Sequence, residues 1–173
     1  MLASCFVGNK GTLNWYFIHL IKHKCITTKF FKINHMEKDF FTSKEATQLT
    51  GCTLRQLQYW RDKEIVVPTI SATGTGRSIY YSYSELVELA IMEYWLAMGF
   101  SFQTASLILE QLRAEQWDYL NPETTEQLMV HWKRDFADLQ LEPFDNERAS
   151  TLLRQGMLVV PFLPPNTLFS FFL

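Results

Sequence analysis

The chain has 173 residues, of which 47% are hydrophobic and 20% are charged, and its formal net charge is −2. This length and apolar content suit one domain, or one domain with an accessory region, that folds around a core. The three cysteines, Cys5, Cys25 and Cys52, are far apart in the sequence. Their spacing excludes a disulfide framework and a C-x-x-C metal pair, and it favours a reducing cytoplasm. The apolar run from Leu13 to Ile21 is too short to span a membrane, so no membrane partner is expected.

The small net charge hides an asymmetry along the chain. Residues 1–35 carry five lysines and no acidic residue, and residues 36–80 carry six basic and five acidic residues. Residues 81–173 carry five basic and thirteen acidic residues. Because affinity for the phosphate backbone comes mainly from positive charge, the acidic C-terminal part is poor material for binding nucleic acid. A surface that binds phosphate is therefore expected in the middle segment rather than in the C-terminal part.

Two short helices are predicted at the start of the middle segment. Thr42 lies three residues before Glu45, and Thr53 lies three residues before Gln56. Both spacings are typical of capping boxes, which open helices. Gly51 should end the first helix, because a left-handed position after a helix costs glycine least. The connection is so short that the two helices must cross steeply, as in a helix-turn-helix.

The second of these helices reads LRQLQYWRDK and separates two kinds of side chain at 100° per residue. Its apolar residues are Leu54, Leu57 and Trp60. Its other face carries Arg55, Gln56, Gln58 and Tyr59. The apolar face suits a core, and the other face carries donors that can read base edges and phosphates. Tyr59 fits either role.

A hairpin is predicted directly after this helix. The run Ile65-Val66-Val67 is β-branched, and Pro68 ends the helical register. A loop rich in glycine, serine and threonine then leads to the alternating run Ser78-Ile79-Tyr80-Tyr81, as in a hairpin. The loop does not precede a helix, so it does not fit a nucleotide fingerprint. With Arg77 at its base, the hairpin is typical of a wing that lies along a phosphate backbone.

Two further helices are expected after the hairpin. Ser82 lies three residues before Glu85, which gives a third capping box, and the helix it opens should end at Gly99. Ser101 can cap another helix that runs through Leu112.

This stretch resembles the DNA-binding domain of the MerR (mercury-resistance-type) family of bacterial transcriptional regulators. The resemblance rests on the order and spacing of four runs over roughly seventy residues. These runs are Leu57-Gln58-Tyr59-Trp60, Glu64-Ile65-Val66-Val67-Pro68, Gly76-Arg77-Ser78-Ile79-Tyr80 and Met98-Gly99-Phe100-Ser101-Phe102. Two positions depart from the family: Gln58 replaces a basic residue, and Glu64 replaces a glycine, which puts the backbone geometry there in question.

The resemblance implies a winged helix-turn-helix DNA-binding domain over residues 36–112. It also implies site residues, carried over position by position. Groove and phosphate contacts are expected from Thr53, Arg55, Gln56, Gln58 and Tyr59. Lys44 is expected to touch the DNA backbone, and Arg77 and Tyr81 are expected to make contacts from the wing. Members of the family distort promoter DNA for polymerase, so RNA polymerase is a candidate partner.

The first 35 residues do not match the family, and two interpretations remain open. Members of the family start a few residues before the first helix, which is where Met36 stands. Residues 1–35 are therefore expected to be disordered or to lie upstream of the true start. Alternatively, Lys22, Lys24 and their neighbours, interleaved with aromatic residues, form a basic arm that reaches DNA.

Residues 113–173 are expected to form a helical linker or dimerisation region and a small C-terminal appendage. A helix opening at Asn121-Pro122 would place Leu128, Trp132 and Phe136 on one face at i, i+4 and i+8, which suggests a dimer contact. Such a stripe fits an intramolecular core equally well. Three leucines of the preceding helix could assist the dimer: Leu107, Leu109 and Leu112.

The last part of the chain is predicted to be α+β. Residues 138–163 indicate a strand, a helix and a strand, and His131 is expected on the surface of a helix rather than as a metal ligand. The apolar tail after them either packs into a partner subunit or is an altered terminus.

The predicted fold is therefore mainly α: a winged helix-turn-helix domain with a small α+β C-terminal appendage. The predicted function is that of a cytoplasmic, dimeric, sequence-specific DNA-binding transcription regulator that binds double-stranded DNA. Two alternatives are an excisionase-like architectural DNA binder and an antitoxin-like protein-interaction module. An enzyme is not expected, because no nucleophile–base pair, phosphate loop or metal cluster stands out, and no cofactor or catalytic residue is predicted.

Overall fold

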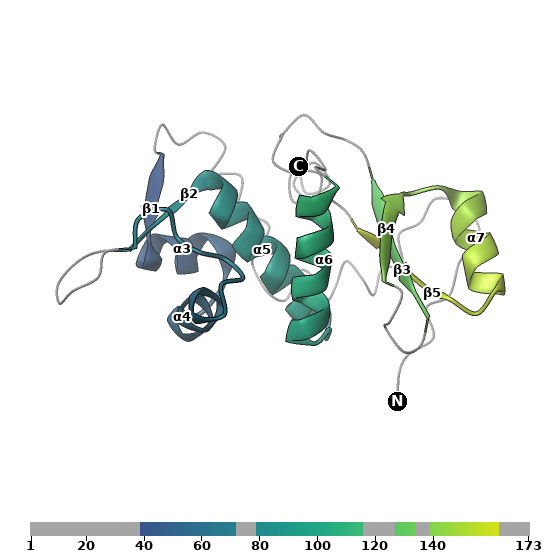
Figure 1. The fold of residues 1–173 in the computed structure, drawn as a ribbon, viewed down its shortest axis with the longest axis horizontal. Helices are drawn as coiled ribbons and strands as arrows, with labels where there is room; N and C mark the ends of the chain where they lie inside the picture. The colour runs from purple at the N-terminus through teal and green to yellow at the C-terminus, as the bar shows by residue number, and fades with distance from the viewer. Residues whose placement is uncertain (1–38, 72–78, 116–126, 134–138, 163–173) are drawn as a thin grey trace.

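The computed structural model of the chain describes residues 39–71, 79–115, 127–133 and 139–162 (Figure 1). The predictions for Arg77, for Phe136 and for the two ends of the chain lie outside these residues. Within them, the chain forms the helices α3 to α7 and the strands β1 to β5.

The predicted pair of short helices is confirmed as α3 (Ser43–Thr50) and α4 (Leu54–Asp62). Thr42 and Thr53 cap them, and each closes the reciprocal box with the residue three positions on, Glu45 or Gln56. Gly51 follows α3 with a φ of 84°, the left-handed conformation expected of it. These local hydrogen bonds satisfy the first donors of each helix and so fix where it begins.

The next two helices are α5 (Tyr83–Ala97) and α6 (Phe102–Ala114), with Ser82 and Ser101 as N-caps as predicted. Most of α5 is buried, and it lies in the middle of the molecule between α3 on one side and α6 on the other (Figure 1). A helix with apolar residues all round is stable only as a core element. This helix is therefore the scaffold on which the other elements pack.

A two-stranded antiparallel sheet pairs the segment before α3 with the segment before α5. β1 (Phe40–Thr42) pairs with β2 (Tyr80–Ser82), and Tyr80 also forms an antiparallel bridge with Ile70. The chain thus pairs at Ile70 rather than along the β-branched run 65–67, where the sequence predicted a strand. Val66 of that run is fully buried, which explains its apolar character without a strand.

The C-terminal part contains a three-stranded antiparallel sheet with strand order β4-β3-β5. The central strand is β3 (Leu128–Trp132), and its neighbours are β4 (Gln140–Pro143) and β5 (Leu158–Phe162). The helix α7 (Asn146–Arg154) connects β4 to β5. The prediction of strand, helix and strand in residues 138–163 is therefore confirmed.

The prediction of a helix through Leu128 and Trp132 is wrong, because these residues lie in β3. A spacing of four places side chains on one face of a helix, but an even spacing also places them on one face of a strand. All five residues of β3 are buried, as in a strand covered on both faces. Leu128 and Trp132 belong to the core of the same chain, so the structure does not offer them as a dimer contact.

The sheet shares its core with the helices. One face of β3 packs toward α5 and α6, and the ring of Trp132 lies 5.4 Å from that of Phe100, measured between centroids. The ring of Phe162 in β5 lies 5.5 Å from that of Trp95 in α5. The other face carries Met129 and is covered by α7. The order along the long axis is therefore α3/α4, α5/α6, sheet and α7 (Figure 1).

Candidate nucleic-acid interface

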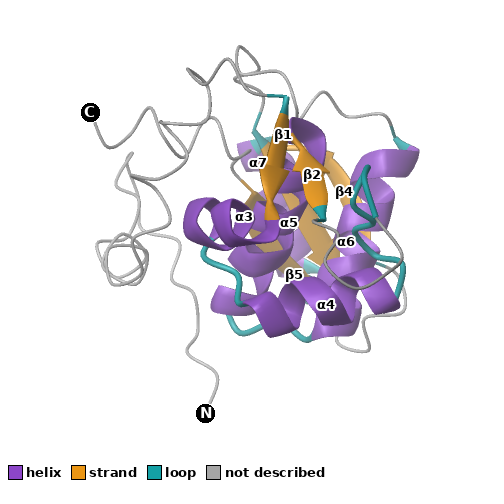
Figure 2. Ribbon diagram, turned by 90° about the vertical axis from the view of Figure 1, so that its left-hand side faces the viewer, coloured by secondary structure: helices purple, strands orange, loops and turns teal. Residues whose placement is uncertain are grey.

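The helix α4 lies at one end of the molecule with one face buried and the other exposed. Viewed from that end, it is on the near side, below α3 and β1 (Figure 2). Leu57 and Trp60 are 2% and 1% exposed and fix the inner face in the core. Leu54, which the sequence placed on the inner face, is 61% exposed and belongs to the outer one.

Five of the residues predicted to contact DNA are exposed at this end of the molecule. They are Lys44 on α3, Thr53 at the N-cap of α4, and Arg55, Gln58 and Tyr59 on α4 itself. The structure thus brings a basic residue, amide and hydroxyl groups and an aromatic ring to one helix face. Such a set can donate to phosphates and to base edges.

Tyr59 combines the two roles that its sequence position allowed. Its side chain is 46% exposed, and its ring meets that of Phe102 edge-on at a centroid distance of 5.0 Å. The Nζ atom of Lys63 lies 5.9 Å from the centre of the same ring. The contact with Phe102 holds the ring in place while leaving part of it on the surface.

Gln56 is engaged inside the molecule. Its Oε1 atom accepts hydrogen bonds from the backbone N–H and the hydroxyl of Thr53, at 2.7 and 2.8 Å. Its Nε2 atom donates to Oε2 of Glu93 at 2.9 Å. The structure therefore gives both polar atoms of this side chain partners other than DNA.

The prediction that Tyr81 contacts DNA from the wing is wrong. It is 1% exposed and stands opposite Phe41 in the strand pair. Alternate residues of a strand point to opposite faces, so Tyr80 and Ser82 point outward while Tyr81 enters the core. Burial raises the pKa of its hydroxyl, and the nearby Arg61 opposes this shift. The resemblance supplied the residue type at this position, but the strand register decides which way the side chain points.

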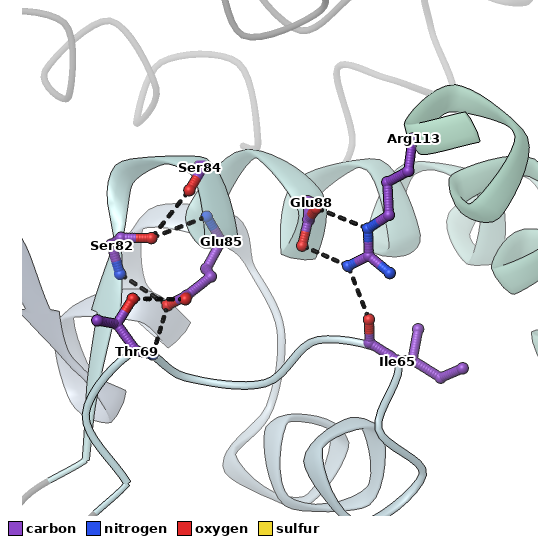
Figure 3. A network of polar contacts seen from close by, with 7 residues as sticks. All are labelled: Ile65, Thr69, Ser82, Ser84, Glu85, Glu88 and Arg113. Atoms are coloured by element: carbon purple, nitrogen blue, oxygen red, sulfur yellow. Dashed lines mark hydrogen bonds and ion pairs between the residues drawn. The ribbon is translucent and has the colours of Figure 1, made fainter. Parts of the chain in front are cut away.

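Two side chains of α5 and α6 fasten the segment that follows α4 (Figure 3). Arg113 donates to both carboxylate oxygens of Glu88, at 2.8 and 2.6 Å, and to the carbonyl oxygen of Ile65 at 2.8 Å. Glu85 accepts from the backbone N–H and the hydroxyl of Thr69, at 3.1 and 2.7 Å. The chain between α4 and Ile70 is thereby tied to the scaffold.

These positioning residues were only partly visible in the sequence. Glu85 was identified as the partner of Ser82 in a capping box, and its Oε2 atom does accept from the backbone N–H of Ser82 at 2.8 Å. Its second task, with Thr69, involves a residue sixteen positions away, and no local spacing encodes it. The same holds for the bond from Arg113 to Ile65.

The end of α4 has the geometry of a helix terminus that normally uses glycine. The N–H of Ile65 bonds to the carbonyl oxygen of Trp60 at 2.9 Å, and that of Glu64 bonds to Arg61 at 2.9 Å. This is a Schellman motif, whose left-handed residue is Glu64 with a φ of 57°. The question that the sequence raised about Glu64 is answered: the backbone keeps the glycine-like conformation.

The thiol of Cys52, which lies just before α4, is unreactive. Cys52 is buried, and its Sγ atom donates to the carbonyl oxygen of Leu89 at 3.6 Å. Burial raises the pKa of its thiol to about 12, a weaker hydrogen bond to Thr50 opposes the shift, and the charge of Glu93 adds to it. The thiol therefore stays protonated near neutral pH and is a poor metal ligand or nucleophile.

His131 is not the surface helix residue that the sequence suggested. It lies in β3, is 2% exposed, and its Nε2 atom is 3.1 Å from Oε1 of Glu142, which Arg148 also contacts. Among the described residues, no group of three or more histidine, cysteine, aspartate and glutamate side chains could hold a metal ion. In the same part of the chain, no helix has both the length and the apolar character needed to cross a bilayer.

Comparison with known proteins places the exposed face of α4 within a family segment. Residues 41–112 match the model of the MerR HTH family of regulatory proteins, which confirms the resemblance over that segment. An uncharacterized HTH-type transcriptional regulator of Mycobacterium bovis is 35% identical over 74 residues. Two of Mycobacterium tuberculosis have the same identity. The match covers 42% of this chain and 33% of each relative, so the chain matches about a third of their length.

Proposed function

We propose that this chain, whose residues 41–112 are of the MerR helix-turn-helix type, is a sequence-specific DNA-binding regulator of transcription. The observation that carries the proposal is the two-sided character of α4. Its inner face is locked by Leu57 and Trp60, and its outer face presents Arg55, Gln58 and Tyr59 to solvent. A helix of this width fits the major groove of B-form DNA, where each base pair shows a distinct donor and acceptor pattern.

The outer side chains have separable tasks in this proposal. Arg55 reads a base edge, with guanine as the best match for a bidentate guanidinium. Gln58 and Tyr59 lie further along the same face, where they meet bases or the adjoining sugar–phosphate backbone. Lys44 on α3 contacts a phosphate, which positions the helix without carrying sequence information. The N–H and the hydroxyl of Thr53 both donate to Gln56, so Thr53 holds the start of α4 instead of binding a phosphate.

The chain is proposed to act as a homodimer on an inverted repeat. Its middle segment is only weakly basic, so a single copy would bind DNA weakly, and two half-sites would raise the affinity. Leu128 and Trp132 are core residues, so the dimer contact must be formed by other residues. Of the three α6 leucines considered, Leu109 and Leu112 are fully buried, whereas Leu107 is 45% exposed and can meet a second copy.

The experiment is a selection from genomic DNA fragments with the purified full chain at several stated salt concentrations. We expect enrichment of one inverted repeat. If this repeat lies within the spacer of a promoter, its location would support action on RNA polymerase. Loose binding that weakens steeply with salt and enriches no sequence would favour an architectural DNA binder instead. Absence of DNA binding at low salt would overturn the proposal and favour a protein-interaction module.

A further inference from the structure

Glu93 is a carboxylate in a place where carboxylates are costly. It lies in α5, the scaffold helix, and is 7% exposed. Removing a carboxylate from water is strongly unfavourable unless hydrogen-bond donors replace the water. One such donor comes from α4: Nε2 of Gln56 lies 2.9 Å from Oε2 of Glu93. The pair spans thirty-seven positions in the sequence and joins the DNA-facing helix to the centre of the molecule.

The same glutamine also fixes the start of α4. Its Oε1 atom accepts from the N–H and the hydroxyl of Thr53, while the Thr53 hydroxyl accepts from the N–H of Gln56 at 3.2 Å. A single side chain thus bonds to the first turn of its own helix through one atom and to the buried scaffold through the other. Rotation or sliding of α4 against α5 by the length of a hydrogen bond would break the contact with Glu93.

We propose that Gln56 and Glu93 are positioning residues, which set the orientation of α4 on α5 and thereby the bases that Arg55 and Gln58 can reach. In this proposal Gln56 is not itself a base contact. The proposal rests on the proposed DNA-binding function and adds to it a determinant of specificity that lies under the helix. Arg55 is the chain neighbour of Gln56, so a tilt of the first turn moves its guanidinium directly.

The first test is the substitution Gln56→Glu. Glutamate at this position keeps an acceptor for Thr53, as in the commonest capping box. The atom that faces Glu93 changes from a donor to an acceptor, and two carboxylates then meet in a poorly hydrated place. The affinity for the selected DNA site should fall by about tenfold or more, because a shifted α4 loses a base contact of that magnitude. The ratio of specific to non-specific affinity should fall as well.

The second test is the double variant Gln56→Glu/Glu93→Gln, which reverses donor and acceptor. The amide on α5 can then donate to the carboxylate on α4, and the cross-helix hydrogen bond is restored. Affinity and base preference should return to within about threefold of the parental values, because the two changes are coupled. If Gln56 touched a base, the new carboxylate would remain in the groove. Affinity would then stay low or the preferred base would change, and the proposal would be overturned.

Gln58→Glu is the matched control, since it makes the same chemical change on the exposed face of the same helix. Its effect on DNA affinity should not be relieved by Glu93→Gln. All variants are compared below their unfolding temperatures, so that loss of folded protein does not pass for loss of binding. Rescue of Gln58→Glu to the same extent as Gln56→Glu would also overturn the proposal.

Failure of the proposed function would look different. If the parental chain selected no DNA sequence, the DNA-binding proposal would fail and the positioning proposal with it. Urea unfolding of the parental chain, Gln56→Glu, Glu93→Gln and the double variant would then show whether the two side chains are coupled in the folded state. If the parental chain bound its site while the double variant showed no rescue, only the positioning proposal would fail.

Discussion

The helix ends in the region of α3 to α6 and the strand pairs in the region of β3 to β5 are defined by interactions of different range. In the first, Thr42, Thr53 and Ser82 each cap a helix through a bond to a residue three positions away. In the second, the pairing of β3 with β5 spans a longer separation, as where Trp132 stands opposite Leu158. The helices therefore have locally defined limits, whereas the strands depend on the rest of the fold.

The two regions nevertheless share one core. The rings of Tyr94, Trp95 and Phe100 on the helix side meet Trp132 and Phe162 on the sheet side, with centroid distances of 5.4 to 5.8 Å across the junction. Contacts of this kind stabilise the fold by more than the burial of their apolar area alone, because the edge of one aromatic ring attracts the face of another. Because they share this core, the two regions should unfold together, in one cooperative transition.

The largest effect is expected from Trp132→Ala. The side chain is 2% exposed and lies at the junction of the two regions, so its removal should lower the free energy of unfolding by about 3–5 kcal/mol. Leu153→Ala on the outside of α7 is the control and should cost far less, because that side chain is 41% exposed. Urea unfolding followed by circular dichroism and by tryptophan fluorescence is the measurement. Loss of the sheet alone, with the helices intact, would show that the regions are independent.

A smaller effect, on binding rather than on stability, separates the regions by function. Arg55→Ala on α4 should weaken binding to the selected DNA site by about 1–3 kcal/mol and relax the preference for one base. Arg154→Ala removes the same charge from an exposed position of α7 and should change binding little. Fluorescence anisotropy titrations at fixed salt compare the two. Equal losses would mean that net charge, and not the face of α4, determines the affinity.

The smallest effect compares helix ends in the two regions. Glu64 ends α4 with a φ of 57°, and Gly156 follows α7 with a φ of 80° in the same type of motif. Left-handed backbone disfavours a side chain, so Glu64→Gly should stabilise the protein by about 1 kcal/mol and Gly156→Ala should destabilise it by about as much. A methyl group at Gly156 meets no atom within 4 Å, so backbone conformation alone sets that cost. Thermal unfolding midpoints should move in opposite directions, and a shift in the same direction would contradict this account.

How much could be predicted from the sequence follows the range of the interactions. The helix limits could be predicted, because a cap and its partner stand three residues apart and this local spacing can be recognised in the sequence. Glu64 could be recognised as unusual in the sequence, because it stands where the family pattern has a glycine. The role of Gln56 could be predicted only in part, since its bond to Thr53 is local and its bond to Glu93 is not.

The errors arose where local patterns are ambiguous. Leu128 and Trp132 lie four positions apart, a spacing shared by one helix face and one strand face. The continuous apolar run Leu128-Met129-Val130 was the better signal, because a strand buried on both faces shows no alternation. Tyr81 was assigned to the wing surface by the family resemblance, although the pairing of β2 with β1 turns it inward. The inward orientation of Tyr81 cannot be derived without knowing which segments come together.

The most direct measurement is photo-crosslinking to DNA from two exposed glutamine positions. A benzophenone amino acid replaces Gln58 on the outer face of α4 or, in a separate protein, Gln155 at the end of α7 at the other end of the molecule. Each protein is irradiated with the selected DNA site and with an unrelated duplex. We expect crosslinks from position 58 to bases of the selected site and none above background from position 155. Equal crosslinking from both positions, or crosslinking from position 155 alone, would contradict the claim that the outer face of α4 reads DNA.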